Sequence, residues 1–286
     1  MTVRPSAPPW YASRAALVAG LTAYLVTFLI VLPLIWVVLL SFRSHDSILE
    51  DPTSLWPISL ENYARVFGTL PLVEMYGNTI LLAVTSVGVG TVISFMSSYA
   101  LSRIVFRRYR ALQSAIRIYL LAGLAIPVYI LLFPIYRLDM ALGLYGSHLS
   151  LILPYIAVTL PFNTLLFTGF LADFPGEIEE AAIIDGVGLW RMCWSVVVPI
   201  MRPVIATVLI FNLIYVFNEY PFVSILSNAE TINTVSLALS NFQGQYRADY
   251  GAMMAASAMI LIPQLAIYAV FQKHVVAGMT VGAVKG

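Results

Sequence analysis

The chain has 286 residues, of which 10% are charged and 60% hydrophobic, and its mean hydropathy is +0.88. Soluble domains carry about 25% charged residues, so this composition excludes a water-soluble globular protein and predicts a protein solvated by lipid. The formal net charge of +1 argues against nucleic acid as a partner.

Six apolar stretches predict an all-α integral membrane protein with six transmembrane helices. A polar, proline-rich segment, residues 1–14, comes first, and a charged segment before an apolar run can be a signal peptide. The run that follows is too long for one, so we expect a retained helix. The transmembrane domain covers residues 15–272, and a tail, residues 273–286, ends the chain. The predicted spans cover about residues 15–40, 76–101, 115–136, 148–171, 203–226 and 251–271.

Two features indicate that these spans pack together around a pathway. The second span is rich in Gly, Ser and Thr, which is typical of a helix packed against other helices. Prolines recur in the spans, and each removes a backbone hydrogen bond that lipid cannot replace. We expect span four to be broken at Pro154 and Pro161, and span three to contain Pro127 and Pro134. Ordinary helix kinking is the simpler interpretation at any single proline.

The distribution of arginine and lysine predicts the orientation in the membrane. Six spans place both termini on one side. Eleven basic residues fall on that side: Arg4, Arg14, Arg103, Arg107, Arg108, Arg110, Arg117, Arg191, Arg202, Lys273 and Lys285. Four fall on the other: Arg43, Arg65, Arg137 and Arg247. We therefore expect both termini, and the loop of residues 173–202, to be cytoplasmic.

The loop of residues 173–202 carries an unusually polar segment between two apolar spans. Pro175 suits the first turn of a helix, and Glu177, Glu179 and Glu180 follow where the helix dipole favours negative charge. A solvated loop whose charges keep it out of lipid is the simplest interpretation. The pattern also predicts a short helix that lies along the membrane surface.

The same segment predicts a turn and a second short helix. Asp185-Gly186 is a strong turn signal, and a helix from Leu189 to about Val197 would follow it. One face of the first helix has little side-chain bulk, so another protein could approach it closely. The residues of that face are Ile178, Ala181, Ala182 and Asp185.

The spacing of this segment resembles the EAA loop of ABC importer permeases. The matching pattern is Glu180-Ala181-Ala182, three residues, Gly186, nine residues, and Val196-x-Val198-Pro199. Further stretches are similar to carbohydrate-type permeases, in particular the second permease of maltose and trehalose importers. They are Ser59-Leu60-Glu61-Asn62-Tyr63, Leu142-Gly143-Leu144, Leu153-Pro154-Tyr155 with Pro161-Phe162, and Gly278-Met279-Thr280 with Gly282 to Gly286. The family often has Ile and Leu at Val196 and Val198, and Trp-Asn-Asp at Phe217-Asn218-Glu219.

The resemblance implies a type I ABC importer permease fold in the inner membrane of a prokaryote. It implies that the EAA loop is a coupling helix seated on a separate ATPase subunit, and that the tail, with Gly278 and Lys285, reaches between two ATPase subunits. The implied coupling residues are Glu179, Glu180, Ala181, Ala182, Asp185 and Gly186. The implied partners are a sister permease, an ATPase dimer and an extracytoplasmic sugar-binding protein, and the implied cargo is a sugar, with a di- or oligosaccharide favoured.

The sequence contains no G-x-x-x-x-G-K-[ST] phosphate loop, so ATP and Mg²⁺ are expected on the partner ATPase. The one cysteine, Cys193, and three scattered histidines offer no metal-ligand spacing. We therefore expect a transport subunit that is not itself an enzyme, with no catalytic residues, metal or cofactor of its own.

A few polar residues in spans four and five are candidates for the translocation pathway. Ionisable groups in a membrane are costly and tend to be functional, and amides, carboxylates and aromatic rings suit sugar hydroxyls and sugar faces. Hydrogen bonding between helices is an equally weighted interpretation. Asn212, Tyr215 and Glu219 have the spacing of one helical stripe. The candidates are Asn163, Asn212, Tyr215, Asn218 and Glu219.

Two other classes of protein compete with this interpretation. An ion-coupled secondary transporter of small polar solutes would need carboxylates at mid-membrane and usually an internal repeat, and neither is evident. A membrane enzyme would need paired acids or a His–acid pair at a membrane face, which the scattered histidines do not supply.

Overall fold

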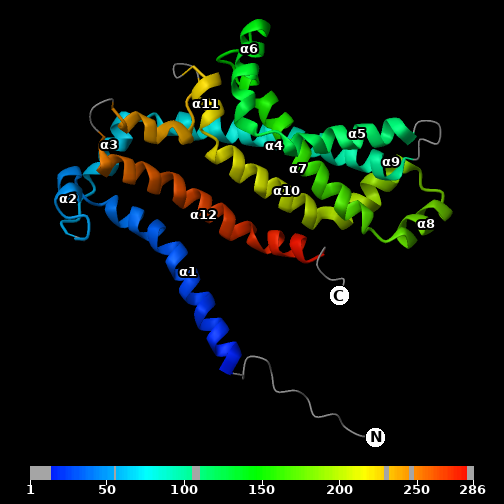
Figure 1. Ribbon diagram of the computed structural model, residues 1–286, viewed down its shortest axis with the longest axis horizontal. Helices are drawn as coiled ribbons and strands as arrows, with labels where there is room; N and C mark the ends of the chain where they lie inside the picture. Colours follow the sequence, from blue (N-terminus) through cyan, green and yellow to red (C-terminus); the bar gives the residue numbers. More distant parts are fainter. Residues whose placement is uncertain (1–13, 55, 105–109, 229–231, 245–247, 282–286) are drawn as a thin grey trace, which may run out of the picture. The chain divides into compact units, whose positions relative to one another are not determined.

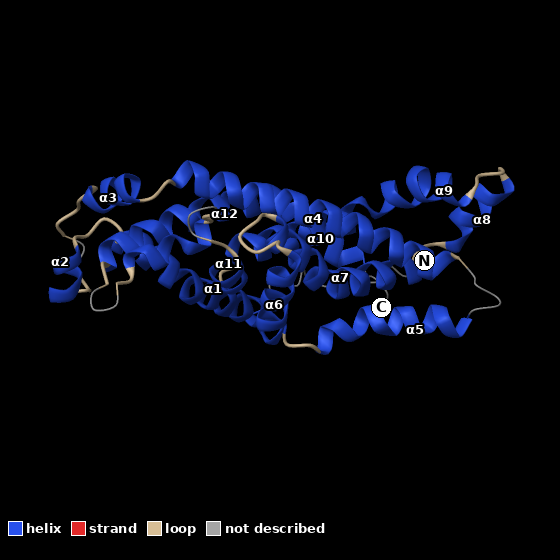
Figure 2. Ribbon diagram, turned by 90° about the horizontal axis from the view of Figure 1, so that it is seen from above, coloured by secondary structure: helices blue, strands red, loops and turns tan. Residues whose placement is uncertain are grey.

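The computed structural model describes residues 14–54, 56–104, 110–228, 232–244 and 248–281, with side chains from Ala16 to Gln272 (Figure 1). The regular elements of this described part are helical, and Figure 2 draws them as helices joined by loops. An isolated antiparallel bridge joins Gln243 and Ala248. The all-α prediction is therefore confirmed. The chain divides into two compact units, residues 1–70 with 239–261 and residues 71–238 with 262–286.

Within the described residues, five helices are long and apolar enough to cross a membrane. They cover Ala16–Leu40, Leu72–Arg103, Leu149–Ala172, Leu189–Asn218 and Tyr250–Gln272. A sixth candidate is a pair of helical segments, Arg110–Ala125 and Val128–Leu142, bent by 98° at the break between them. When the bent pair is counted as one span, these candidates correspond to the six predicted spans.

The first unit contains α1 (Arg14–Leu40), α2 (His45–Glu50), α3 (Glu61–Thr69) and the start of α12 (Tyr250–Val281). Buried Asn62 joins its parts, because its Nδ2 donates to the carbonyls of Ser41 at 2.9 Å and Arg43 at 2.6 Å. Gly251 allows the start of α12 to pack against the Asn62 side chain, because a Cβ at this glycine would lie 2.6 Å from Asn62 Oδ1. A side chain at this position would therefore force the pieces apart.

The second unit contains α4 (Leu72–Arg103), α5 (Arg110–Ala122), α6 (Leu132–Leu142) and α7 (Leu149–Ala172). It continues with α8 (Gly176–Ile184), α9 (Leu189–Met192), α10 (Val198–Asn218), α11 (Pro221–Leu226) and the rest of α12.

The helices α4 and α7 pack closely along a stripe of small residues on α4. Ser86, Gly90, Ser94 and Ser98 recur every fourth residue and are buried. A Cβ at Gly90 would lie 3.4 Å from Thr159 Oγ1, so the helices approach closely there. Small residues of this kind let helix backbones come together in a membrane, where burying apolar surface gives no advantage over lipid. The predicted helix–helix packing of the second span is confirmed.

The third span, predicted over about residues 115–136 with Pro127 and Pro134, consists of two helical segments, Arg110–Ala125 and Val128–Leu142, with a sharp bend between them. After α5 and a 3₁₀ turn, the chain is extended at Ile126 and Pro127, and α6 then runs to Leu142. The proline ring restricts the preceding residue to extended backbone, and Ile126 has φ −90° and ψ 118°. The break therefore forms at Pro127, while Pro134 lies within α6.

The prediction that span four is broken at Pro154 and Pro161 is wrong. Helix α7 runs from Leu149 to Ala172 without a break, with Pro154 and Pro161 inside it. Its packing along α4 outweighs the lost backbone hydrogen bonds. Gly123 leaves room for the ring of Pro161, because a Cβ at this glycine would lie 2.5 Å from Pro161 Cγ.

The fifth span begins and ends earlier than the predicted residues 203–226. A π-helical turn, Cys193–Val197, joins α9 to α10, so one helical run covers Leu189–Asn218. The predicted second short helix is thus the first part of the span. The run ends because Glu219 is extended, with ψ 114°, and Pro221 starts the separate helix α11.

An ion pair and a cap hold the start of α12 in the first unit. Asp249 pairs with Arg65, and its Oδ1 accepts the N–H of Ala252 at 3.0 Å. Burial alone would raise the pKa of Asp249, but the bonds from Ala252 and Arg65 outweigh it and lower the pKa below its usual value. The folded protein therefore favours the ionised carboxylate.

We predict that Asp249→Asn lowers the free energy of unfolding by about 1 kcal/mol at neutral pH, because the ion pair is lost. Since the folded pKa is depressed, the contribution is complete above the unfolded value of about 4 and disappears as the pH falls through the folded value. Denaturant unfolding of the purified protein in mild detergent, at a series of pH values, measures the difference. Glu50→Gln, at an exposed acid of α2, is the matched control. A difference that stays constant in strong acid would contradict this account.

Candidate functional site

Helix α8 is the predicted first helix of the cytoplasmic loop, and a closed glycine turn ends it. Gly186 has φ +75°, a left-handed conformation that favours glycine. Its N–H donates to the carbonyl of Ile183 at 2.9 Å, and the N–H of Val187 donates to that of Ala182 at 3.0 Å. This pair of bonds is a Schellman motif, which satisfies carbonyls at the end of a helix. The turn predicted at Asp185-Gly186 is confirmed.

The exposed face of α8 differs from the predicted one. Ala182 is half-buried and packs with Val187 against the hydrophobic core, so it does not share an open face with Ala181 and Asp185. The Schellman closure causes this, because it brings Val187 back over Ala182. Glu180 and Ala181 are exposed, and Ile184 is 85% exposed.

The two adjacent glutamates of α8 point to different surroundings. Glu180 is exposed to solvent, whereas Glu179 is half-buried and forms an ion pair with Arg103 at the end of α4, with 2.7 Å between Oε1 and Nε. Glu179 is therefore bound within the chain, and its neighbour Glu180 presents an exposed carboxylate.

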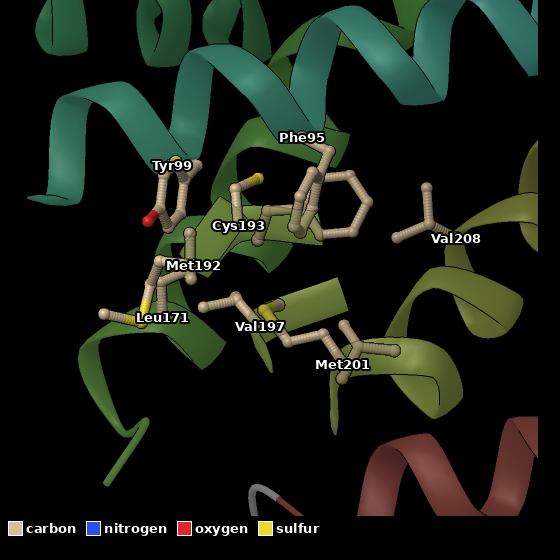
Figure 3. Close-up of a cluster of buried hydrophobic side chains, with 10 residues drawn as sticks. Phe95, Tyr99, Leu171, Met192, Cys193, Val197, Met201 and Val208 are labelled. Carbon is tan, nitrogen blue, oxygen red and sulfur yellow. The ribbon is translucent and has the colours of Figure 1, made fainter. Parts of the chain in front are cut away.

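A cluster of buried apolar side chains joins the elements that carry α8 (Figure 3). Phe95 of α4 contacts Phe167 of α7 edge to face, with ring centroids 5.3 Å apart. Tyr99 Oη donates to the carbonyl of Leu189 at 3.3 Å. The cluster consists of Phe95, Tyr99, Phe167, Leu171, Met192, Cys193, Val197, Met201, Val204 and Val208. It connects α4, α7 and the run from α9 to α10, and Ala182 of α8 packs against it.

Two of the predicted pathway residues bond to each other between helices. Asn212 Nδ2 on α10 donates to Asn163 Oδ1 on α7 at 2.8 Å, and both side chains are buried. Asn218 donates to the carbonyl of Ile214 in its own helix and accepts from Gln264 at 3.2 Å. These amides therefore hold helices together, as the second interpretation of these residues expects.

Glu219 does not extend the predicted stripe, because α10 ends one residue before it. Its buried carboxylate caps α11: Oε1 accepts the N–H of Phe222 at 2.9 Å, and Oε2 accepts the N–H of Val223 at 3.2 Å. Tyr155 Oη of α7 donates to Oε2 at 3.0 Å. Glu219 thus satisfies backbone donors at a helix start and attaches that start to α7.

A cavity of about 320 Å³ lies where the broken third span meets α7 and α10. Of the pathway candidates, Asn212 and Tyr215 line it, and Asn163 lies behind Asn212. The rings of Phe162 and Phe211 meet edge to face at 6.3 Å and form part of its wall. The complete lining is Gly123, Leu124, Ile126, Val128, Val158, Thr159, Pro161, Phe162, Phe211, Asn212 and Tyr215.

The predicted tail contacts stay predictions. Gly278 lies within the last turns of α12, beyond the last described side chain, and Lys285 lies outside the described residues.

Comparison with known proteins decides the class to which this arrangement belongs. Residues 90–281 match the family described as binding-protein-dependent transport system inner membrane component. The chain belongs to this family. The matched region of this inner membrane component includes α8, the hydrophobic cluster and the whole cavity lining.

Relatives of this membrane component extend over nearly its whole length. It is 34% identical over 257 residues to an ABC transporter permease protein of Caldicellulosiruptor sp., covering 89% of this chain and 91% of the relative. It is 30% identical to a diacetylchitobiose uptake system permease of Streptomyces coelicolor (94% and 89% covered), and 29% identical to a trehalose/maltose transport system permease of Thermococcus litoralis (96% and 97%). The fold is similar to a chain of a bacterial alginate ABC transporter, with a TM-score of 0.68, 17% identity and coverage of 89% and 92%.

Sequence reasoning missed two residues of the site. One is Arg103, which the sequence indicates only as one of the basic residues that orient the chain, although it pairs with Glu179. Tyr155 was noted only as part of a family motif. Its spacing of eight residues from Asn163 on one helix is the signal that both lie on one side of α7, where Tyr155 bonds to Glu219 and Asn163 to Asn212.

We predict that Glu219→Ala lowers the free energy of unfolding by about 2 kcal/mol, because buried N–H groups lose their acceptor, and that Tyr155→Phe costs about 1 kcal/mol. The double variant should lose less than the sum, since both changes break the same bond. Denaturant unfolding in mild detergent measures this, and Tyr220→Phe, at an exposed neighbour, is the control. Unchanged stability in Glu219→Ala would contradict the capping role.

Proposed function

We propose that this chain is the permease subunit of an ATP-driven importer that moves a sugar, with a di- or oligosaccharide favoured, across the inner membrane of a prokaryote. Relatives whose printed names concern diacetylchitobiose and trehalose/maltose support the sugar assignment. The observation that carries the proposal is α8 itself: a short exposed helix with the EAA spacing, closed by the Gly186 turn and seated on the core that joins α4, α7 and α10.

The proposal assigns the energy source to other subunits. A separate ATPase dimer binds ATP and Mg²⁺, a sister permease completes the pathway, and an extracytoplasmic binding protein delivers the sugar. In this arrangement the chain is a transport subunit rather than an enzyme. Membership of the binding-protein-dependent family supports this assignment of sugar delivery and transport to different subunits.

Helix α8 is the surface proposed to dock on the ATPase. The exposed Glu180, Ala181, Asp185 and Gly186 form the contact, together with Ile184. An apolar side chain as exposed as Ile184, beside a free carboxylate, suits a protein cleft that offers both an apolar pocket and a basic residue. The remaining coupling candidates, Glu179 and Ala182, support the helix from behind.

The cavity between the broken third span, α7 and α10 is the proposed place where this chain borders the sugar pathway. Irregular backbone at membrane depth persists where it is buried in protein or lines a cavity, and the break at Pro127 adjoins this one. Asn212 and Tyr215 would supply polar contacts and Phe162 an aromatic surface. An ion-coupled secondary transporter is less favoured, since the carboxylate of Glu219 is occupied in capping α11.

The docking proposal predicts that Glu180→Arg and Gly186→Val stop ATP-dependent uptake while the protein still inserts in the membrane. Charge reversal removes the free carboxylate, and a β-branched residue at φ +75° costs about 1–2 kcal/mol and opens the turn. Copurification with the ATPase and sugar uptake by proteoliposomes of the complete transporter measure the effect. Glu50→Arg makes the same charge change on α2 and should copurify normally. Full uptake with both positions changed would overturn the assignment.

A further inference from the structure

Arg103 binds three different groups around the base of α8. Its Nε contacts Glu179 Oε1 at 2.7 Å, and its Nη2 donates to the carbonyl of Leu171 in the last turn of α7 at 2.7 Å. Its guanidinium carbon lies 5.9 Å from the centroid of the Phe174 ring, in the segment that connects α7 to α8. One side chain at the end of α4 therefore holds the end of α7, the connecting segment and α8.

The chemistry of this contact requires arginine. The planar fork of the guanidinium presents donors in two directions, so one edge binds the carboxylate while another reaches the carbonyl. Lysine would carry the charge but could not reproduce both contacts with the same geometry. Leu171 belongs to the last turn of α7, and its carbonyl also accepts the N–H of Phe174 at 3.4 Å, so the arginine bonds to an acceptor that closes the end of the helix.

Burial makes this ion pair more than a surface contact. The side chains of Arg103 and Glu179 are 20% and 16% exposed, so water and salt screen the pair less than an exposed one. Removing either partner would leave the other charge partly buried and unpaired, which costs more than the pair itself contributes. The orientation of α8 against α4 is therefore strongly defined.

The covalent connections of α8 explain why this contact matters. The chain links α8 to α7 through residues 173–175 and to α9 through the Gly186 turn. Its link to α4 is made through space, by the ion pair of Arg103 with Glu179 on one side and by the packing of Ala182 and Val187 on the apolar cluster on the other. The ion pair is the directional part of that link.

We propose that Arg103 is a positioning residue that passes the movement of α8 to α4 and α7, so that ATP hydrolysis on the partner is converted into sugar movement. Glu179 and Glu180 then have separate tasks: Glu180 faces the ATPase, and Glu179 anchors the helix to its own subunit. This inference rests on the proposed function, and it goes beyond that function by dividing the coupling segment into a docking side and an anchoring side.

The test compares sugar transported per ATP hydrolysed in proteoliposomes of the complete transporter. Arg103→Gln and Glu179→Gln should still copurify with the ATPase, because Glu180 is untouched, but the ratio should fall about tenfold, which corresponds to about 1.4 kcal/mol. The charge-exchanged double variant, Arg103→Glu with Glu179→Arg, should recover most of the ratio by re-forming the pair. Arg103→Lys should be intermediate. Arg117→Gln, at an exposed arginine of α5, should match the wild type.

Two results would overturn the proposal: a wild-type ratio in both single variants, or a double variant no better than the singles. If the wild-type transporter itself shows no ATP-dependent sugar uptake, the proposed function fails, and the anchoring pair is tested without it. In that case the unfolding midpoints of the full-length chain in mild detergent test whether Arg103 and Glu179 form the ion pair. The two single changes must be non-additive, and simple additivity would reject the pair.

Discussion

The close packing of α4 on α7 is the constraint on which the rest of the second unit depends. In lipid, helices gain little by burying apolar surface, so they associate where small residues let their atoms meet. The stripe from Ser86 to Ser98 provides that fit, and the edge-to-face contact of Phe95 with Phe167 adds to it. Every element proposed to act in transport is attached to this pair.

The break in the third span and the continuity of the fourth follow from the same packing. Both contain prolines, and both lose backbone hydrogen bonds. Helix α7 stays intact because α4 supports it along its length, whereas the chain at Pro127 borders the cavity and turns by 98°. After the end of α10, the Glu219 carboxylate likewise satisfies backbone groups that lack a partner within a helix, because it accepts the first N–H groups of α11. Glu219, a predicted pathway residue, thus serves to satisfy the backbone.

Much of the fold could be predicted from the sequence, because hydropathy and spacing act over whole helices. The six spans, the helix at Gly176–Ile184 and the turn at Gly186 all follow from local patterns. The ends of the spans could not be predicted, since a π-helical turn and a carboxylate cap decide them through contacts distant in sequence. The inward side of α8 was missed for the same reason: the Schellman closure buries Ala182, and Arg103, 76 positions before Glu179, turns that glutamate inward. Helical spacing identifies residues on one face but not which face the tertiary structure covers.

The central claim is that α8 and α4 move as one body when the ATPase closes. Spin labels at the exposed positions Ile183 on α8 and Ile93 on α4 allow their separation to be measured in the complete transporter, without nucleotide and with ATP trapped. The account predicts the same distance distribution in both states, while the distance from Ile183 to a label on the sister permease changes and reports that the transporter has switched. A shift between Ile183 and Ile93 as large as that change would contradict it.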